Sequence, residues 1–179
     1  SPVLVSQSNA NIILRIDDPF ALESAVEGLT FRGANFPQAL AILISNGGSV
    51  RNCRFENFEG GVCSAGNSEV SDSVFLDCIT TVADQATARG STYVRCTFQN
   101  TNPPNHLGYH VAGGSSVFRN CTFRGGPVAI KSDSTSHAPK LIGCTFENIT
   151  LRPEQRVFRS LFSPFDIDSC LFRNIVSPG

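Results

Sequence analysis

Apolar and polar positions alternate over short stretches of this chain, and the same alternation recurs seven times. The recurring unit is Cys-x-Phe-x-Asn, which occurs four times, and three degenerate copies at residues 29–33, 73–77 and 121–125 share its frame. Residues i, i+2 and i+4 of extended backbone point to one face, so each unit predicts a half-buried strand. The seven copies are Leu29-Thr-Phe31-Arg-Gly33, Cys53-Arg-Phe55-Glu-Asn57, Ser73-Val-Phe75-Leu-Asp77, Cys96-Thr-Phe98-Gln-Asn100, Cys121-Thr-Phe123-Arg-Gly125, Cys144-Thr-Phe146-Glu-Asn148 and Cys170-Leu-Phe172-Arg-Asn174.

The spacing of the copies indicates a solenoid. The phenylalanines stand at positions 31, 55, 75, 98, 123, 146 and 172, so successive spacings are 24, 20, 23, 25, 23 and 26. A fixed period of 20 to 50 residues is typical of stacked repeats. The variation of a few residues fits β-coils with loops of unequal length.

Two more short strands accompany each copy. An apolar stretch that ends in a turn precedes it, as in Gly48-Ser-Val50, and a turn followed by another strand comes after it, as in Gly60-Gly-Val-Cys63. Three short strands separated by bends make a triangular coil, and stacking pairs each strand with its counterparts about 4.8 Å away. The stretch 18–26 begins with Asp18-Pro19, a helix-start signal, so a short helix is also expected there.

The strings Asn120-Cys-Thr-Phe123 and Gly143-Cys-Thr-Phe-Glu-Asn148 resemble the right-handed parallel β-helix repeat of the pectate-lyase-like superfamily. The resemblance covers roughly residues 11 to 179. It implies an all-β fold, a right-handed single-stranded parallel β-helix of about seven coils of three short strands. From its length, the chain 1–179 is expected to be a single β-helix domain and a module of a longer protein or assembly. The superfamily contains lyases, glycosidases, phage tailspikes and adhesins, so the resemblance specifies the fold more closely than the function.

Two inward ladders follow from the repeat. The rings are expected to stack as one buried column, and the amides to form a buried, hydrogen-bonded ladder at a bend, since stacked amides can donate to one neighbour and accept from the other. The ladder residues are Phe55, Phe98, Phe123, Phe146, Phe172, Asn57, Asn100, Asn148 and Asn174, with Asp77 in register.

The repeat cysteines are expected to be free, buried thiols. Cys53, Cys96, Cys121, Cys144 and Cys170 occupy one inward column, and their wide spacings lack the paired sets typical of metal sites. Cys63 and Cys78 lie off this column. Disulfides between coils remain an alternative on distance alone. No metal and no cofactor is predicted.

Composition narrows the classes of partner. Lys plus Arg is 14 and Asp plus Glu is 15, giving a net charge of −1, without the basic excess of a nucleic-acid surface. No run approaches the 18 apolar residues of a membrane span. Charged residues make up only 16% of the chain, and this uncharged polarity favours a secreted or cell-surface protein.

Enzymes of this superfamily hold substrate along the strand after the Gly-rich turn. Aligning Val62, Val82, Val111, Val128 and Val157 predicts that His110, Arg156, Lys131 and Phe158 lie on its outer strip. This strip has cations but no carboxylate, whereas a glycosidase needs two carboxylates and a calcium-dependent lyase needs an Asp cluster. Asp72, Asp77 and Asp84 fall on a turn, on the inward ladder and at a strand end.

Two loops are further candidates for binding. Residues 101–108 and 131–140 are insertions, and loops on rigid scaffolds often carry ligand contacts. The candidate ligand-binding residues are His106, His110, Lys131 and Arg156. Asn120-Cys-Thr122 and Asn148-Ile-Thr150 are N-glycosylation sequons, of which only Asn120 is expected to be accessible.

Both ends are expected to be open. No capping element is evident beyond the strand at Ile12–Ile16 or the last repeat, so neighbouring coils or subunits are expected to contact the ends. The sequence therefore favours a non-catalytic extracellular module with a structural, adhesive or glycan-contacting role, in a filament or surface assembly. The alternative is a polysaccharide lyase or glycoside hydrolase. Ice binding is disfavoured, because the Thr97, Thr122 and Thr145 column is short and flanked by charges.

Overall fold

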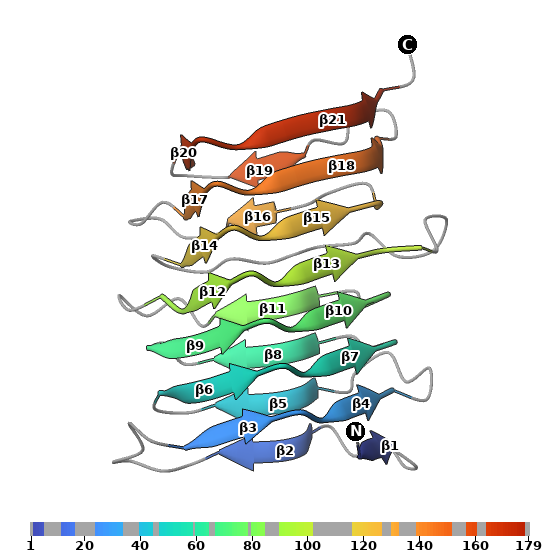
Figure 1. The fold of residues 1–179 in the computed structure, drawn as a ribbon, viewed down its shortest axis with the longest axis vertical. Coiled ribbons are helices and arrows are strands. Elements are labelled where there is room, and N and C mark those ends of the chain that lie inside the picture. The colour runs from blue at the N-terminus through green and yellow to red at the C-terminus, as the bar shows by residue number, and fades with distance from the viewer. Residues whose placement is uncertain are drawn as a thin grey trace.

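The chain forms a solenoid of parallel β-strands (Figure 1). The computed structural model describes residues 2–5, 12–16, 24–33, 40–44, 47–58, 60–64, 67–78, 80–84, 90–101, 116–126, 130–132, 139–151, 157–160 and 164–177. Strands of successive coils lie one above another along the long axis, with β1 at the bottom and β21 at the top of the view (Figure 1). Every pair of neighbouring strands is parallel, as a solenoid of stacked coils requires.

Sheet A contains the repeat strands. Its order is β1 (Val3–Val5), β4 (Thr30–Arg32), β7 (Arg54–Glu56), β10 (Val74–Leu76), β13 (Thr97–Gln99), β15 (Thr122–Arg124), β18 (Thr145–Thr150) and β21 (Leu171–Val176). This sheet has eight strands, one more than the repeats predict, because β1 precedes the first copy.

The other faces are formed by three more sheets. Sheet C is β3 (Ala25–Glu27), β6 (Gly48–Arg51), β9 (Ser68–Ser71), β12 (Thr92–Val94), β14 (Val117–Arg119), β17 (Lys140–Ile142) and β20 (Asp166–Asp168). Sheet B is β2 (Ile12–Ile16), β5 (Leu40–Ile44), β8 (Gly60–Ser64) and β11 (Thr80–Asp84). Sheet D is β16 (Ile130–Ser132) and β19 (Phe158–Ser160).

The described residues contain no helix. The helix expected over 18–26 is wrong at its described end, where Ala25 and Val26 belong to strand β3. Residues 17–23 lie outside the described part of the chain. Val26 is buried and pairs in register with Val50 of the next coil, so stacking overrides the local helix-start signal.

The phenylalanines form one continuous column inside sheet A. Neighbouring rings from Phe31 to Phe172 stack with centroids 4.7 to 5.1 Å apart. Each ring pairs with its counterpart because the strand register matches the repeat residue for residue. Tyr93 and Phe118 project inward from sheet C and meet Phe98 edge to face, which fills the interior.

The column cysteines lie beside these rings at the corner between sheets C and A. Each thiol donates to a backbone carbonyl of the coil below, for example Cys96 to Val70 at 3.4 Å and Cys144 to Phe118 at 3.5 Å. Six cysteines are free thiols in the part of the chain whose side chains are described: Cys53, Cys78, Cys96, Cys121, Cys144 and Cys170.

The buried amide ladder is wrong for three of its four asparagines. Asn57, Asn148 and Asn174 are exposed, Asp77 is half-buried, and only Asn100 is buried. The cause is backbone geometry: Asn57, Asn148 and Asn174 have φ of 58°, 53° and 52°, which ends the alternation of extended backbone. One rung of the ladder forms at the surface, where Asn174 Nδ2 donates to Asn148 Oδ1 at 3.0 Å.

Candidate functional site

One residue per coil makes the turn from sheet C into sheet A, and we call this column the C–A corner. All seven members have left-handed φ between 51° and 69°. They are Gly28, Asn52, Asp72, Arg95, Asn120, Gly143 and Ser169. Glycine, asparagine and aspartate tolerate this conformation, so their recurrence directly before the Cys-x-Phe unit or its degenerate copies is a signal that the sequence contained. Arg95 and Ser169 carry no such signal.

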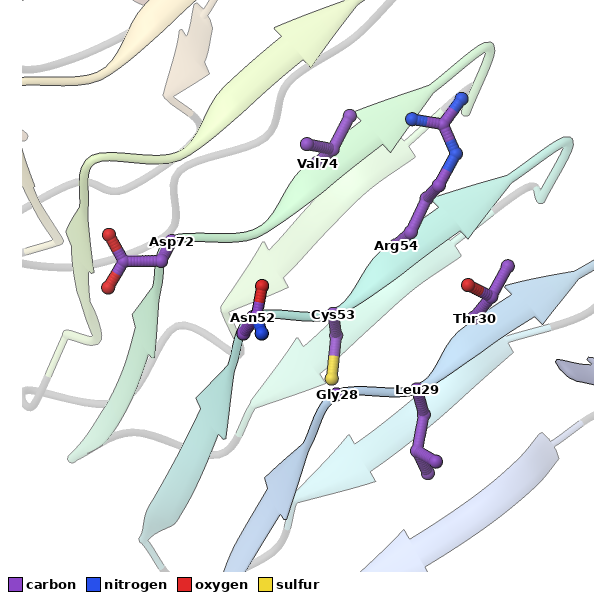
Figure 2. Close-up of a pocket in the computed structure, with 8 residues that line it drawn as sticks. All are labelled: Gly28, Leu29, Thr30, Asn52, Cys53, Arg54, Asp72 and Val74. Atoms are coloured by element: carbon purple, nitrogen blue, oxygen red, sulfur yellow. The ribbon is translucent and has the colours of Figure 1, made fainter. Parts of the chain in front are cut away.

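A groove lined by both polar and apolar side chains follows the C–A corner near the N-terminal end (Figure 2). It has a volume of about 280 Å³ and is lined by Gly28, Leu29, Thr30, Asn52, Cys53, Arg54, Asp72 and Val74. Asn52 and Asp72 stand at the corner, with Arg54 and Val74 on the sheet A side (Figure 2). The groove opens at Gly28, where an added Cβ would meet no atom within 4 Å.

The charges around the groove already have partners. Arg95 donates to both carboxylate oxygens of Asp72 at 2.6 and 2.7 Å, and these hydrogen bonds hold the pKa of Asp72 below its usual value. Arg54 pairs with Glu56 on its own strand. The side-chain amide of Asn52 is exposed and offers both a donor and an acceptor to a ligand.

Two clusters of arginine and glutamate lie on the outer face of sheet A. Glu147 accepts from Arg124 at 2.6 Å on one oxygen and from Arg173 at 2.5 Å on the other. Glu56 accepts from Arg32 of the preceding coil, at 2.7 Å, and pairs with Arg54 of its own strand. Hydrogen bonds from Arg124 and Arg173 keep the pKa of Glu147 below its usual value, and those from Arg54 and Arg32 do so for Glu56. These carboxylates therefore connect neighbouring coils.

The last coil exposes apolar surface. The large hydrophobic side chains that are exposed in the described residues all lie on β20 and β21: Ile167, Leu171, Phe172 and Val176. Phe172 stacks on Phe146 with one face only, and β21 is the last strand of sheet A. Its outer edge has no neighbouring strand in the described part of the chain.

Comparison with known proteins agrees with this geometry. The family model for the right handed beta helix region matches residues 7–149. The chain belongs to the right-handed β-helix family. This membership is consistent with the resemblance to the pectate-lyase-like superfamily. No curated protein and no solved structure matches the chain.

The strip predicted on the β-helix for substrate is partly wrong. Val62 pairs with Val82, as the alignment predicts. In sheet D, however, Ile130 pairs with Phe158, whereas aligning Val128 with Val157 would place Ile130 opposite Arg159. A shift of one residue exchanges the faces of a strand. Phe158 accordingly packs inward, against Phe146 and Phe172, instead of lying on the outer strip.

Most candidate ligand-binding residues lie outside the described part of the β-helix. His106, His110 and Arg156 are among these, as are most residues of the loops 101–108 and 131–140. Lys131 lies in β16 and is in register with Arg159 of β19, but its side chain is not described. Asn120 is exposed at the C–A corner.

The acidic residues of the β-helix are dispersed. Asp72 lies at the C–A corner and Asp84 ends β11, as expected, but Asp77 leaves the inward ladder. Its carboxylate accepts from the backbone N–H of Thr101 at 2.5 Å and from the Thr101 hydroxyl at 2.6 Å. Among described residues, no group of three His, Cys, Asp or Glu side chains could hold a metal ion.

Burial and contacts between neighbouring thiols set the pKa values of the cysteines, and the hydrogen bond with Cys121 lowers the pKa of Cys144 to about 7. Burial raises the pKa of Cys78 to about 12 and also raises that of Cys53. The neighbouring thiols of Cys144 and Cys96, together with burial, raise the pKa of Cys121. Thiols with raised pKa values are poor nucleophiles and poor metal ligands, which suits a packing role. In the described residues, no helix is long and apolar enough to cross a membrane.

Proposed function

We propose that this β-helix is a non-catalytic, extracellular structural module whose last coil packs against neighbouring β-helix coils or a protein subunit. The observation that carries the proposal is the exposed apolar surface of β20 and β21. Leu171 and Val176, at the two ends of β21, are 52% and 55% exposed, and Ile167 and Phe172 are 43% and 44% exposed. Exposed apolar side chains beside an open strand edge are typical of a binding surface.

The outer charges support a structural role. Four carboxylates each pair with an arginine or lysine side chain of a neighbouring coil: Glu56, Asp72, Glu147 and Asp166. Such links oppose relative movement of the coils along the axis. The low charge content of the chain favours an extracellular setting.

The apolar surface is tested by hydrophobic-interaction chromatography and dye binding. The double variant Leu171→Ser and Val176→Ser should be retained less and bind less hydrophobic dye than the parent protein. The matched control is Leu76→Ser with Ile142→Ser, which removes two outward, half-buried apolar side chains from inner coils. Equal retention of parent and Leu171→Ser/Val176→Ser protein would contradict the proposal.

The corner groove favours glycan contact as a second candidate role. It combines an exposed amide, a guanidinium and apolar walls at Val74 and Leu29, a combination that suits a sugar ring and its hydroxyls. Retention on a panel of anionic and neutral polysaccharides should weaken for Asn52→Ala. Asn120→Ala is the matched control, because Asn120 is also an exposed corner residue but lies outside the groove.

The same panel tests the enzymatic alternative. New reducing or unsaturated ends in the polysaccharide would show a glycoside hydrolase or a lyase. That result would overturn the non-catalytic proposal.

A further inference from the structure

We infer that the outer face of sheet A binds a sulfated polysaccharide that lies along the axis of the solenoid. The second and fourth residues of the seven repeat copies make this face, on strands that stack from β4 to β21 (Figure 1). The charged residues that are exposed at these positions are all positive. The exposed residues are Leu171 and four arginines: Arg32, Arg54, Arg124 and Arg173. The inference goes beyond the proposed structural role and uses the extracellular setting proposed there.

The two carboxylates of this face lie beneath the arginines. The side chain of Glu147 is 4% exposed, whereas those of its partners Arg124 and Arg173 are 45% and 57% exposed. The second cluster has the same build, because the side chain of Glu56 is 14% exposed and those of its two arginines are 55% and 44% exposed. Each cluster has two arginines and one glutamate, so one positive charge is in excess. A ligand that approaches the face therefore meets guanidinium groups.

The glutamates also hold the arginines in place. Arg124 Nε donates to Glu147 at 2.6 Å, and Arg32 Nε donates to Glu56 at 2.7 Å. A guanidinium carries five N–H donors, more than these contacts use, so further donors are available to a ligand. Arginine side chains that are already fixed lose less conformational entropy when they bind, and their planar fork suits an oxyanion.

The distance between the two clusters favours a polymer. In the register of sheet A, Glu56 is followed by Leu76, Gln99, Arg124 and Glu147 on successive coils. Four steps of about 4.8 Å separate the two glutamates by about 19 Å. A small anion reaches one cluster, whereas a linear polyanion reaches both, and its second contact is then intramolecular and gains effective concentration.

The side chains between the clusters favour a sulfated sugar chain. Thr97, Thr122 and Thr145 form a row of half-buried hydroxyl groups beside the arginines. A sulfate ester has three terminal acceptor oxygens, so it can accept from Arg124 and from the Thr122 hydroxyl of the same strand. Single-stranded nucleic acid binds through stacking on aromatic side chains, and the outward positions of the seven repeat copies contain none.

Sheet C provides an internal comparison. Its exposed outward residues include cations, among them Arg51 and Arg119, but also several exposed carboxylates. These carboxylates would repel a polyanion, so the two faces should differ in binding. The exposed acids of sheet C are Glu27, Glu69, Asp166 and Asp168.

Binding of the full chain to immobilised dextran sulfate over a range of salt concentrations tests the inference. Arg124→Gln/Arg173→Gln should weaken binding about fivefold per arginine, the upper range for an exposed charge pair, and should reduce its salt dependence. The matched control is Arg51→Gln/Arg119→Gln, which removes the same charge from sheet C and should change binding little.

A gain of binding tests the same face in a variant that leaves both clusters intact. Gln99 is a half-buried outward residue of sheet A, in register with Arg124 of the next coil. Gln99→Lys should raise the salt concentration at which dextran sulfate is released. Thr92→Lys, at a half-buried outward position of sheet C, is its control and should raise it less.

Several outcomes would overturn the inference. These are no saturable binding of dextran sulfate at low salt, equal effects of the sheet A and sheet C variants, and tighter binding of polygalacturonate or single-stranded DNA than of dextran sulfate. Arg124 and Arg173 lie outside the corner groove, so the Asn52→Ala panel reports separately on that groove. The chromatography of Leu171→Ser/Val176→Ser likewise reports separately on the proposed structural role.

Discussion

The rings of Phe123 and Phe146 lie parallel, with centroids 4.8 Å apart and an interplanar angle of 4°. Both are fully buried, and each is held by the strand register of sheet A. Phe123→Ala should lower the free energy of unfolding by about 3–5 kcal/mol, because the cavity adds to the lost burial. Denaturant titration measures the loss.

The matched control for this substitution is Phe172→Ala. Phe172 belongs to the same column but is 44% exposed and stacks on one face only. Its removal should cost about half as much or less, since less apolar area returns to water. Equal losses at the two positions would contradict the account of the column.

Glu147 should contribute to stability in a pH-dependent way. Its side chain is 4% exposed, and hydrogen bonds from Arg124 and Arg173 lower its pKa. A lowered folded-state pKa gives stability that is present above the usual pKa near 4.5 and lost as pH falls through the folded value. Glu147→Gln should cost about 1 kcal/mol at pH 7, because the half-exposed arginines are screened by water.

The pH dependence of the unfolding free energy distinguishes the contribution of the Glu147 charge from that of its packing. The difference in unfolding free energy between the parent protein and Glu147→Gln should shrink as the solution is acidified below pH 4.5. Glu69→Gln, at an exposed position of sheet C, should show little difference at any pH. A Glu147→Gln difference that is unchanged on acidification would rule out the charged hydrogen bonds as its source.

Much of this fold is predictable because the alternation of inward and outward residues recurs in every copy of the repeat. The small-x-Phe pattern places Cys96 and Phe98 inside and Thr97 outside, since all three lie in extended backbone. Asn148 fails the same rule, because a left-handed φ of 53° turns its side chain to solvent. Alternation predicts faces only up to the first residue that leaves the extended conformation.

Features that depend on contact between coils were not predictable. Glu147 occupies an outward position and is nevertheless buried, because two arginines from neighbouring coils cover it. The register of β16 with β19 also differs by one residue from the valine alignment, and this change turns Phe158 inward. Short strands between loops of unequal length leave register to packing.

Alanine substitutions at Gly28 and Gly125 compare the cost of a left-handed backbone with the added cost of a steric clash. Gly28 and Gly125 both have φ of 69°, but an added Cβ meets no atom within 4 Å at Gly28 and lies 2.2 Å from the Asn100 carbonyl oxygen at Gly125. Gly28→Ala should cost about 1 kcal/mol, the usual penalty of a left-handed alanine. Gly125→Ala should cost more than twice as much, since the backbone of a neighbouring coil must move. Thermal and denaturant unfolding measure the loss of stability in each variant. Equal losses would show that the neighbouring coil accommodates the added methyl group at Gly125 without cost.

Asn120 is predicted to accept an N-linked glycan when the chain is produced through a eukaryotic secretory pathway. It is exposed at the C–A corner and begins the sequon Asn120-Cys-Thr122. Asn148 also begins a sequon and is exposed, but its Oδ1 accepts a hydrogen bond from Asn174. Mass spectrometry should therefore find higher occupancy at Asn120, and Asn120→Gln should remove most of the added mass. Greater occupancy at Asn148 would contradict this ranking.

The thiols should differ in reactivity according to whether each is buried or partly exposed. Cys170 is half-buried in the last coil, whereas Cys53, Cys78, Cys96, Cys121 and Cys144 are buried. A thiol reagent at pH 8 should modify Cys170 before these five, since Cys170 is the one described thiol that is partly accessible to a reagent from solution. Peptide mapping by mass spectrometry resolves each position. Reductant should leave the melting temperature nearly unchanged, because the six described thiols are free.

Alkaline solution gives the complementary test of the same thiols. Burial raises the pKa of Cys78 to about 12, whereas in the unfolded chain it titrates near 8.5. The unfolded state therefore loses this proton first, so the stability from the buried thiol is complete below pH 8.5 and decreases as pH rises toward 12. Unfolding midpoints measured between pH 7 and pH 10 should fall, and Cys78→Ala should reduce that slope. Rapid labelling of Cys78 in the folded protein at pH 8, ahead of Cys170, would show that this buried position is open to solvent and that Cys78 does not serve as a packing group.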